Sequence, residues 1–411
     1  MTVLLLTDLP PCSNYTAGIV TAQMCRAVAP DPLAMFCVLN RHLAPAPYPD
    51  LAGIPQMTVT KPNEVGVRRW RGVPLGGAGA VAVEMGKRLL LTPQIARQAV
   101  QYGRAQGATS LWAVLQGQTM LRLALPVARG LGLPLRLHIW DPLGWWHRAH
   151  LVDAVNAALD RRLFDRTLRA GEVVASASWA MTEHFARTYG VRGEPVIAAL
   201  DRALLRHPPP APHREGRLVL GMAGQFYAEQ EWRDLLAALG AMGWRAGGRD
   251  VSLLTFGRDA PPGEVPPGRL DHRGWAAQAE VVRVLSEEAD VLHCAYPFAP
   301  EMAEVARLSF PSKLPTFFAA GRPVLFHGPA ESSPAGYLRR RGAALLVEEA
   351  GPGALPAALT HLAGDAPLFR RLAAAAQEAF LADFTLEPQR AAVRRFLGLS
   401  PDAAPATPAP A

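Results

Sequence analysis

Residues 309–329 read SFPSKLPTFFAAGRPVLFHGP, and this stretch decides the fold prediction because it holds a loop, a short helix and a buried strand. Residues 310–313 form the loop, since proline lacks a backbone donor and extends the residue before it. Residues 314–320 form one to two helical turns, which Gly321 ends in a left-handed conformation. The apolar run 323–326 then predicts a strand.

The start of this helix is a candidate anion site. Ser312 supplies a hydroxyl and Lys313 an ammonium group, and the first turn of a helix carries free backbone N–H groups. A diphosphate suits such a site. A capped helix beside a surface lysine explains the same residues, and the local pattern does not separate the two interpretations. Lysine is rare here, however, because only three of the 42 basic residues are lysines: Lys61, Lys87 and Lys313.

Length and composition favour two globular domains. The chain has 411 residues, of which 50% are hydrophobic and 19% charged, and this is long for a single core. No apolar run approaches the roughly 20 residues of a membrane span, and no secretory signal precedes the first strand. We therefore expect a cytoplasmic protein, with peripheral attachment to the inner face of the membrane as a further option.

The net charge of +7 comes mainly from arginine and does not by itself predict binding to nucleic acid. No basic run alternates with aromatic residues, as a groove for single strands requires. An acidic ligand or an anionic membrane surface is the more natural partner. The four cysteines lack metal-ligand spacing, so we expect buried free thiols and neither zinc nor disulfides. These are Cys12, Cys25, Cys37 and Cys294.

The first half of the chain starts with the pattern of a parallel α/β domain. The apolar run 3–7 predicts a central strand buried on both faces. Loop 8–17 and the helical run 18–28 complete the first unit of a Rossmann-like domain. Gly18 would let a ligand approach the backbone, although turn chemistry is the more frequent reason for such a glycine. Further strands are expected at 34–39, 110–115 and 172–176, and helices at 92–107, 119–131, 153–170 and 179–189.

The run 135–146, LRLHIWDPLGWW, is the most informative part of the first half. It begins as a strand, and His138, Trp140 and Asp141 fall at or just beyond the carboxyl end, where open α/β sheets bind ligands. Aromatic faces pack on apolar ring surfaces, so the run predicts a site for a sugar or lipid acceptor. A packing cluster of tryptophans between domains is the alternative.

A proline-rich segment separates the two halves. Residues 207–216 read HPPPAPHREG, which is typical of an exposed, semi-rigid linker. The pattern then restarts with a strand at 218–222, a loop and a helix. Further strands are expected at 251–256, 291–295 and 345–348, and helices at 278–288 and over most of 368–397. The composition from Ser400 onward predicts a disordered tail.

These residues resemble the GT-B glycosyltransferases, and most of all the retaining glycosyltransferase family 4. The stretch 310–329 is similar to that family's PSKL-x-EY-x-AAG-x-PV donor element, and residues 289–291 to its ADV strand. Residues 221–224 resemble the glycine-bearing start of the family's second domain. The resemblance is strong over 217–350 and diffuse before it. It implies an α/β protein with two Rossmann-like domains that face each other across a cleft.

The resemblance also implies a division of labour between the domains. Residues 1–206 would bind the acceptor, 207–216 would be the linker, and 217–380 would bind the nucleotide sugar. Residues 381–399 would form a helix that could return to the N-terminal domain, and 400–411 would be the tail.

Site residues follow from the same resemblance. Ser312 and Lys313 would hold the donor diphosphate, and Gly18 would face the sugar phosphate. His138 would lie near the reacting carbon and Trp275 near the nucleobase. The predicted donor set is Gly18, Gly224, Gln225, Arg258, Trp275, Ser312, Lys313 and Leu314, and the predicted acceptor set is Asn14, Tyr15, Trp140 and Asp141. No metal or cofactor is implied, apart from a UDP-, GDP- or dTDP-sugar as co-substrate.

The chain departs from the family pattern at two places. Leu308 and Thr316 stand where the family has two glutamates. Glu301 or Glu304 could replace the first, so the catalytic candidates are these two and His138. The loop after strand 218–222 reads GQFYAEQEW, with Gln225 and Gln230 near the positions of the family's Arg and Lys. The phosphate charge would then rest on Lys313, with Arg258 or Arg322.

We therefore predict a glycosyltransferase that moves a sugar from a nucleotide-sugar donor to a glycan, lipid-linked or small-molecule acceptor, with retention and without metal. Two alternatives stay open: a degenerate GT-B protein that binds a glycan or partner without catalysis, and a nucleotide-sugar epimerase. A dinucleotide oxidoreductase is disfavoured, because no Gly-x-Gly-x-x-Gly follows a strand.

Overall fold

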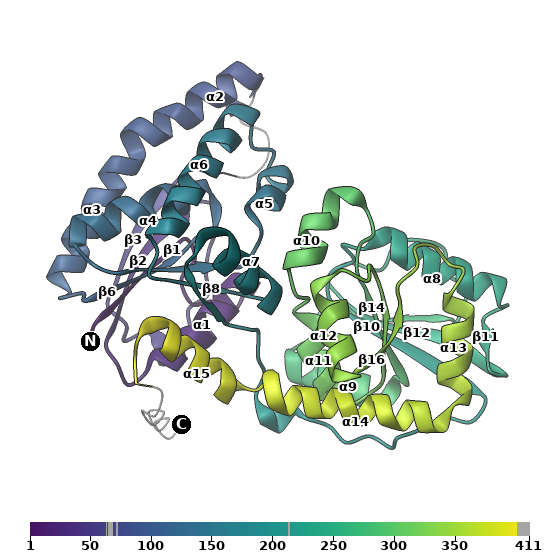
Figure 1. Ribbon diagram of the computed structural model, residues 1–411. Helices are drawn as coiled ribbons and strands as arrows, with labels where there is room; N and C mark the ends of the chain where they lie inside the picture. Colours follow the sequence, from purple (N-terminus) through teal and green to yellow (C-terminus); the bar gives the residue numbers. More distant parts are fainter. Residues whose placement is uncertain (63, 65–68, 71–72, 213, 401–411) are drawn as a thin grey trace. The chain divides into compact units, whose positions relative to one another are not determined.

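The computed structural model describes residues 1–62, 64, 69–70, 73–212 and 214–400, and it divides into two compact units (Figure 1). Unit 1 comprises Met1–Ile197 together with the last described residues, 389–400, and unit 2 comprises Ala198–Pro388. Each unit is an α/β domain built on a mainly parallel sheet. The predicted pair of Rossmann-like domains is therefore confirmed, and the predicted tail, from 401 onward, lies outside the described residues.

The sheet of unit 1 has seven strands, all parallel, in the order β3-β2-β1-β6-β7-β8-β9. Its central strands are continuous apolar runs because helices cover both faces, and all five residues of β1 are buried. The strands are β1 (Val3–Thr7), β2 (Leu33–Asn40), β3 (Gln56–Lys61), β6 (Ser110–Val114), β7 (Leu135–Ile139), β8 (Val173–Ser176) and β9 (Arg192–Pro195). A separate antiparallel pair joins β4 (Arg69–Trp70) to β5 (Val73–Pro74).

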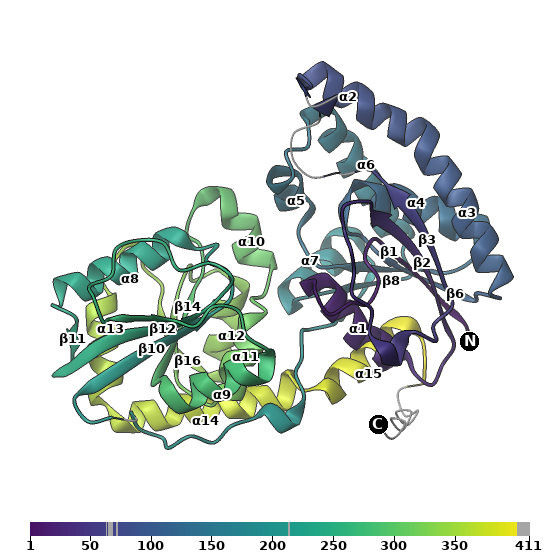
Figure 2. The ribbon, with the colours of Figure 1, turned by 180° about the vertical axis from the view of Figure 1, so that it is seen from behind.

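Two layers of helices enclose this sheet, as Figures 1 and 2 show from opposite sides. One layer contains α2 (Gly77–Gly86), the π-helical turn η2 (Lys87–Leu91), α3 (Thr92–Ala105), α4 (Gly117–Leu131) and α6 (Ala154–Ala170), with α7 (Trp179–Tyr189) beside α6. The other layer contains α1 (Thr16–Val28) and α15 (Leu386–Leu397). Side chains of α1 and α15 share one core with Trp112 of β6.

A buried arginine fixes α15 to α1. Arg394 is 0% exposed, and its Nη1 donates to the carbonyls of residues 27–29 at 2.8 to 3.3 Å, while its Nη2 pairs with Asp31 at 2.7 Å. The last carbonyls of a helix have no partner within the helix, and a cation is favourable there. From Gln389 onward, α15 is therefore a structural part of unit 1.

We expect the substitution Arg394→Ala to lower the free energy of unfolding by about 3 kcal/mol, because it leaves buried helix carbonyls and Asp31 without their donor. Urea denaturation measures the loss. The matched control is Arg395→Ala on the same helix, where the side chain is 53% exposed and pairs with Glu194. This control should lose less than about 1 kcal/mol, and equal losses in the two variants would contradict the prediction.

The sheet of unit 2 has the order β11-β12-β10-β14-β15-β16, with β13 paired to β12. All pairs are parallel except that of β11 with β12. The strands are β10 (Arg217–Ala223), β11 (Arg245–Ala246), β12 (Arg249–Phe256), β13 (Leu270–His272), β14 (Val291–Ala295), β15 (Val324–His327) and β16 (Ala344–Val347). Strands β10, β12 and β14 lie where the sequence predicts them.

Helices pack on both faces of this second sheet. The core beneath one face joins β10 to α8 (Glu229–Ala241) and α13 (Leu355–Gly364). On the other face α9 (Gln278–Glu288) packs close to β10 because Gly221 has no side chain: a Cβ there would lie 2.7 Å from that of Ala289. The remaining helices are α10 (Ala303–Leu308), α11 (Lys313–Ala320), α12 (Ser333–Arg341) and α14 (Ala366–Asp383). The predicted helix over 368–397 is thus divided between α14 and α15. No helix in the described part of the chain combines the length and the apolar character needed to cross a bilayer.

The predicted linker, 207–216, is part of unit 2 over its described residues. Arg322, which is 0% exposed, donates to the carbonyls of Pro209 and Ala211 at 3.0 and 3.1 Å and to that of Ser286 at 2.9 Å. The boundary between the units instead follows Ile197. Proline carbonyls keep their full acceptor capacity, so a proline-rich segment can be bound as firmly as any other. Arg322 therefore holds this segment and is not directed at a phosphate.

Candidate functional site

The chain changes direction along the sheet of unit 2 at β10, which lies between β12 and β14. Ligands of open α/β sheets bind beside the carboxyl ends of the strands at such a point. Gly224 follows β10 with φ +93°, a conformation that favours glycine, and its N–H donates to Phe256 O at 3.0 Å. Gly257 N donates in turn to Gly274 O at 3.0 Å. The loops after β10, β12 and β13 therefore form one bonded rim.

Lys313 reaches this rim from the first residue of α11. Its side chain is buried, and its Nζ donates to Gln225 O at 3.4 Å and lies 5.1 Å from the ring centroid of Tyr227. No carboxylate pairs with it among the residues that the structure describes. Burial lowers the pKa of Lys313, and the Cys294 thiol opposes that shift. A buried cation in this state is a ready partner for a ligand anion.

The other two lysines of the chain are bound differently. Lys61 pairs with Glu64 at 2.9 Å, and Lys87 pairs with Glu84 at 2.7 Å. Each of these two ammonium groups thus pairs with a carboxylate of the protein itself. Lys313 differs from them, and this difference favours a diphosphate site over the alternative of a surface lysine beside a helix cap.

The remaining predicted donor residues lie around Lys313 in different ways. Ser312 is exposed, and its hydroxyl does not cap α11. Trp275 is 75% exposed in the loop after β13, and Arg258 is exposed in the loop after β12. Leu314 is fully buried, so its side chain belongs to the core. The structure therefore brings Gly224, Gln225 and Lys313 together and places Arg258 and Trp275 on adjoining loops.

A neutral side chain, that of Thr316, stands where the pattern of glycosyltransferase family 4 has its second glutamate. Thr316 is buried on α11, and its Oγ1 accepts a hydrogen bond from Gln278 Nε2 at 2.8 Å. Glu301 lies exposed in the short helix Pro300–Met302, and Glu304 is half-buried in α10. Both residues have an interaction partner within the fold.

The predicted donor role of Gly18 finds a different explanation in unit 1. Gly18 is buried in α1, where a Cβ would lie 2.1 Å from Cys12 Sγ, so the glycine is needed for close packing within the chain. Asn14 Nδ2 donates to Ala44 O at 2.8 Å and its Oδ1 accepts from Ala46 N at 2.9 Å. Tyr15 Oη accepts from Ala44 N at 3.4 Å. These two predicted acceptor residues therefore hold the loop at 44–46.

His138 lies in the hydrophobic core of unit 1. It is 1% exposed, and its ring centroid lies 6.1 Å from that of Trp112 and 5.8 Å from that of Phe396. Its Nε2 accepts a hydrogen bond from Trp140 Nε1 at 3.1 Å. Burial lowers the pKa of His138 to about 3, so the ring is neutral. The structure thus corrects the predicted catalytic role, because α15 covers the ring and no substrate reaches it.

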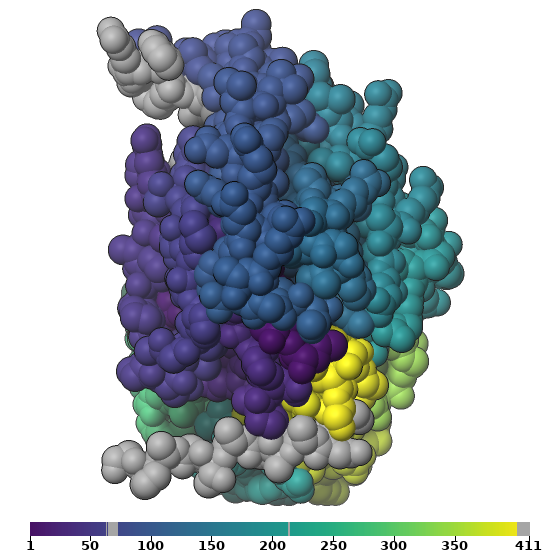
Figure 3. Space-filling view, turned by 90° about the vertical axis from the view of Figure 1, so that its left-hand side faces the viewer, coloured from purple at the N-terminus to yellow at the C-terminus, as the bar shows by residue number. Residues whose placement is uncertain are grey.

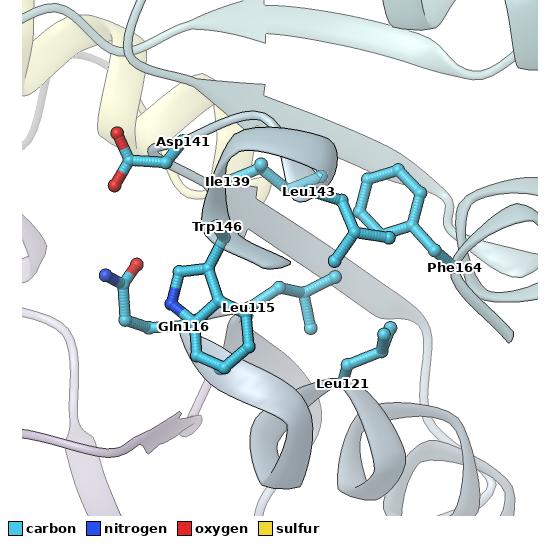
Figure 4. Close-up of a pocket in the computed structure, with 9 residues that line it drawn as sticks. Leu115, Gln116, Leu121, Ile139, Asp141, Leu143, Trp146 and Phe164 are labelled. Atoms are coloured by element: carbon cyan, nitrogen blue, oxygen red, sulfur yellow. The ribbon is translucent and has the colours of Figure 1, made fainter. Parts of the chain in front are cut away.

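Asp141 lines a small pocket at the carboxyl ends of β6 and β7, shown in Figure 4. Burial raises the pKa of Asp141, and a hydrogen bond with Gln116 opposes the shift. The carboxylate and the amide lie at one side of the pocket, and leucine and phenylalanine side chains close the other. The lining residues are Leu115, Gln116, Gly117, Leu121, Ile139, Asp141, Leu143, Trp146 and Phe164. Trp140 is half-buried nearby in sequence but is not part of this lining.

Asp8 and Glu64 are two further carboxylates of unit 1 that the sequence patterns did not single out. Asp8 directly follows β1, and burial raises its pKa to about 6, with Lys61 opposing the shift. Glu64 accepts from Thr119 N at 2.8 Å, in the first turn of α4. Strand β1 is the point at which the sheet of unit 1 changes direction, so an acidic residue just after it was the signal available in the sequence.

The low pKa of His138 predicts a measurable dependence of stability on pH. The unfolded chain takes up a proton on this histidine below about pH 6.5 and the folded chain does not, so stability falls as the pH falls. From about pH 7 to about pH 5 one such histidine contributes a loss of about 2 kcal/mol. The variant His138→Phe has no such group, so its free energy of unfolding should fall by about 2 kcal/mol less than that of the original chain between these two pH values.

Urea denaturation at the two pH values measures this difference. His42→Phe, on an exposed loop, is the matched control and should keep the pH dependence of the original chain. An identical pH dependence in His138→Phe and the original chain would mean that His138 titrates normally in the fold.

No protein-family model matches this sequence, and no curated protein matches it. Solved structures do match. The crystal structure of Anabaena Alr3699/HepE in complex with UDP-glucose aligns with a TM-score of 0.62 at 16% identity, covering 96% of this chain and 99% of that chain. A glycosyltransferase from Rickettsia africae aligns at 0.60 with 10% identity, covering 97% and 99%. Sucrose-phosphate synthase from Thermosynechococcus elongatus aligns at 0.59 with 14% identity, covering 95% and 96%. These similarities establish the GT-B fold.

Proposed function

We propose that this GT-B chain is a glycosyltransferase that binds a nucleotide-sugar donor in unit 2 and transfers the sugar to a glycan, lipid-linked or small-molecule acceptor. The observation that carries the proposal is the buried ammonium of Lys313, which has no carboxylate partner among the described residues and stands at the switch point of a parallel sheet. Retention of configuration and independence of a divalent metal are part of the proposal.

The chemistry of sugar transfer fits this arrangement. The leaving diphosphate gains negative charge while the sugar becomes cationic, so a catalyst needs positive groups at the phosphates. Lys313 supplies a charge, Ser312 a hydroxyl, and the start of α11 its dipole. Gly224 has no side chain to keep the diphosphate from the backbone. The exposed ring of Trp275 offers a face for a nucleobase.

A second candidate function is binding of a nucleotide or glycan without catalysis. The neutral pair of Thr316 and Gln278 favours it, because this pair cannot supply the charge that a glutamate would. The two candidates agree on donor binding and differ in turnover.

Titration calorimetry with UDP-, GDP- and dTDP-sugars tests whether the protein binds a donor. Product analysis after long incubation tests whether it turns the donor over. UDP-glucose is the first ligand to try, since HepE was solved with it. Binding accompanied by transfer or slow hydrolysis supports the transferase. Binding without either supports the second candidate, and the absence of binding across the panel rejects both.

Lys313→Met should weaken the binding of UDP by about 1 to 3 kcal/mol, or roughly 5- to 150-fold, because it removes a charge-assisted contact. The folded protein should be as stable as before or more stable, since burial disfavours the charged form of Lys313. Calorimetry and thermal melting measure the two effects. Unchanged affinity would show that Lys313 does not bind the diphosphate, and a large loss of stability would indicate a structural role.

Trp275→Ala should weaken the binding of UDP about tenfold, because stacking on a base contributes on the order of 1 to 3 kcal/mol. Inorganic diphosphate has no base, so its binding should be unaffected by this variant and weakened by Lys313→Met. Trp275→Phe retains a ring and is the matched control. Equal effects of Trp275→Ala on both ligands would contradict a role at the nucleobase.

A further inference from the structure

Helix α2 and the turn η2, residues 77–91, read GAGAVAVEMGKRLLL and contain only three charged residues. All three are bound on the inner side. Glu84 is 2% exposed and pairs with Lys87 at 2.7 Å, and Arg88 pairs with Asp160 of α6 at 2.5 Å. Arg122 of α4 joins the two carboxylates, at 3.1 Å from Glu84 and 3.4 Å from Asp160. The charges of this segment are therefore neutralised beneath it.

The outer side of the same segment is apolar. Leu89 and Leu90 are 65% and 75% exposed, and Ala78 and Ala82 are exposed as well. A helix on the surface of a globular protein normally has the opposite arrangement, with apolar residues inside and charges in water. Two adjacent leucines that are exposed to solvent, above a buried ionic network, indicate that this face is an interaction surface.

The neighbouring helix extends the apolar surface. Leu151 and Val155, in the turn before α6 and in its first turns, are 66% and 52% exposed, and the pair of Arg88 with Asp160 ties α6 to η2. The layer is seen in Figure 1 as α2, α3 and α6, and in Figure 3 the segment from α2 to α3, in blue, forms part of the face of unit 1 that is turned to the viewer.

In α2, η2, α3, α4 and α6 the exposed charged residues are all arginines, and the exposed acidic residue Glu183 lies on the adjoining helix α7. Within 77–105, 117–131 and 154–170, each acidic side chain is buried or half-buried. Arg97 of α3 and Arg161, Arg162 and Arg166 of α6 are exposed. The surface is thus apolar and cationic, and a second copy of the same surface would face like charge. Its complement is an anionic headgroup above an apolar interior.

We propose that this layer docks on the surface of a membrane that contains anionic phospholipid. Leu89 and Leu90 enter the boundary between headgroups and acyl chains, and the arginines of α3 and α6 bind lipid phosphates. The inference is independent of the proposed function, because it needs neither donor nor acceptor.

Co-sedimentation of the full chain with vesicles tests it, using phosphatidylcholine alone or mixed with phosphatidylglycerol. We expect binding to the mixed vesicles only, and weaker binding at high salt. The double substitution Leu89→Gln with Leu90→Gln should reduce that binding at least about tenfold, since it removes two apolar side chains from the interface. Leu381→Gln, at a residue 38% exposed on α14 of unit 2, is the matched control and should bind like the original chain.

Thermal melting checks that the double variant folds, and we expect no change because both leucines are exposed. Equal binding by the original chain and the double variant would overturn the proposal, as would failure of the original chain to bind mixed vesicles. A dimer in analytical ultracentrifugation that the double variant loses would also overturn it, in favour of a second copy as the occupant.

Discussion

A buried cation stabilises a fold only where acceptors surround it, and both units of this chain depend on that condition. Arg394 in unit 1 and Arg322 in unit 2 are each 0% exposed, and each donates to carbonyls near the end of a helix, α1 in one case and α9 in the other. Those carbonyls have no partner within their own helix. One guanidinium therefore satisfies several backbone groups and ties distant segments together, 27–31 to α15 and 209–211 to α9. Each arginine thus fixes a distant segment of the chain to the unit in which it lies.

The same condition separates Lys313 from the other lysines. Lys61 and Lys87 each have a carboxylate of the protein within hydrogen-bonding distance. Lys313 has a backbone carbonyl and an aromatic ring, which offset less of the cost of burying a charge. A protein keeps such a group where a ligand completes its surroundings. The donor site that we propose and the lowered pKa of Lys313 thus have the same cause, the burial of this ammonium group without a carboxylate partner among the described residues.

On α2 and η2, in contrast to Lys313, the charged side chains are paired with one another inside the protein. Because Glu84, Lys87 and Arg88 satisfy one another and Asp160 beneath the helix, no charge of this segment remains for solvent. Its outer face is then free to be apolar, and the arginines of the neighbouring helices give the layer its positive charge. Sequence periodicity alone does not predict this inversion, since the pattern of charged and apolar residues is the same whichever side faces the sheet.

The sequence by itself determined the succession of strands and helices, and it suggested the anion site that we propose at Lys313. Helices α7 and α9 and strand β14 have the predicted limits, because each is a short periodic run ended by a glycine, a loop or a change of period. Lys313 stood out as a rare lysine at the start of a helix. Tertiary structure decided which side chains are accessible. His138 is buried because Phe396, from a helix more than 240 positions later, covers its ring. The space beside Gly18 is filled by the side chain of Cys12. Burial and hydrogen-bond partners arise from contacts between distant segments, and local patterns carry no record of those contacts.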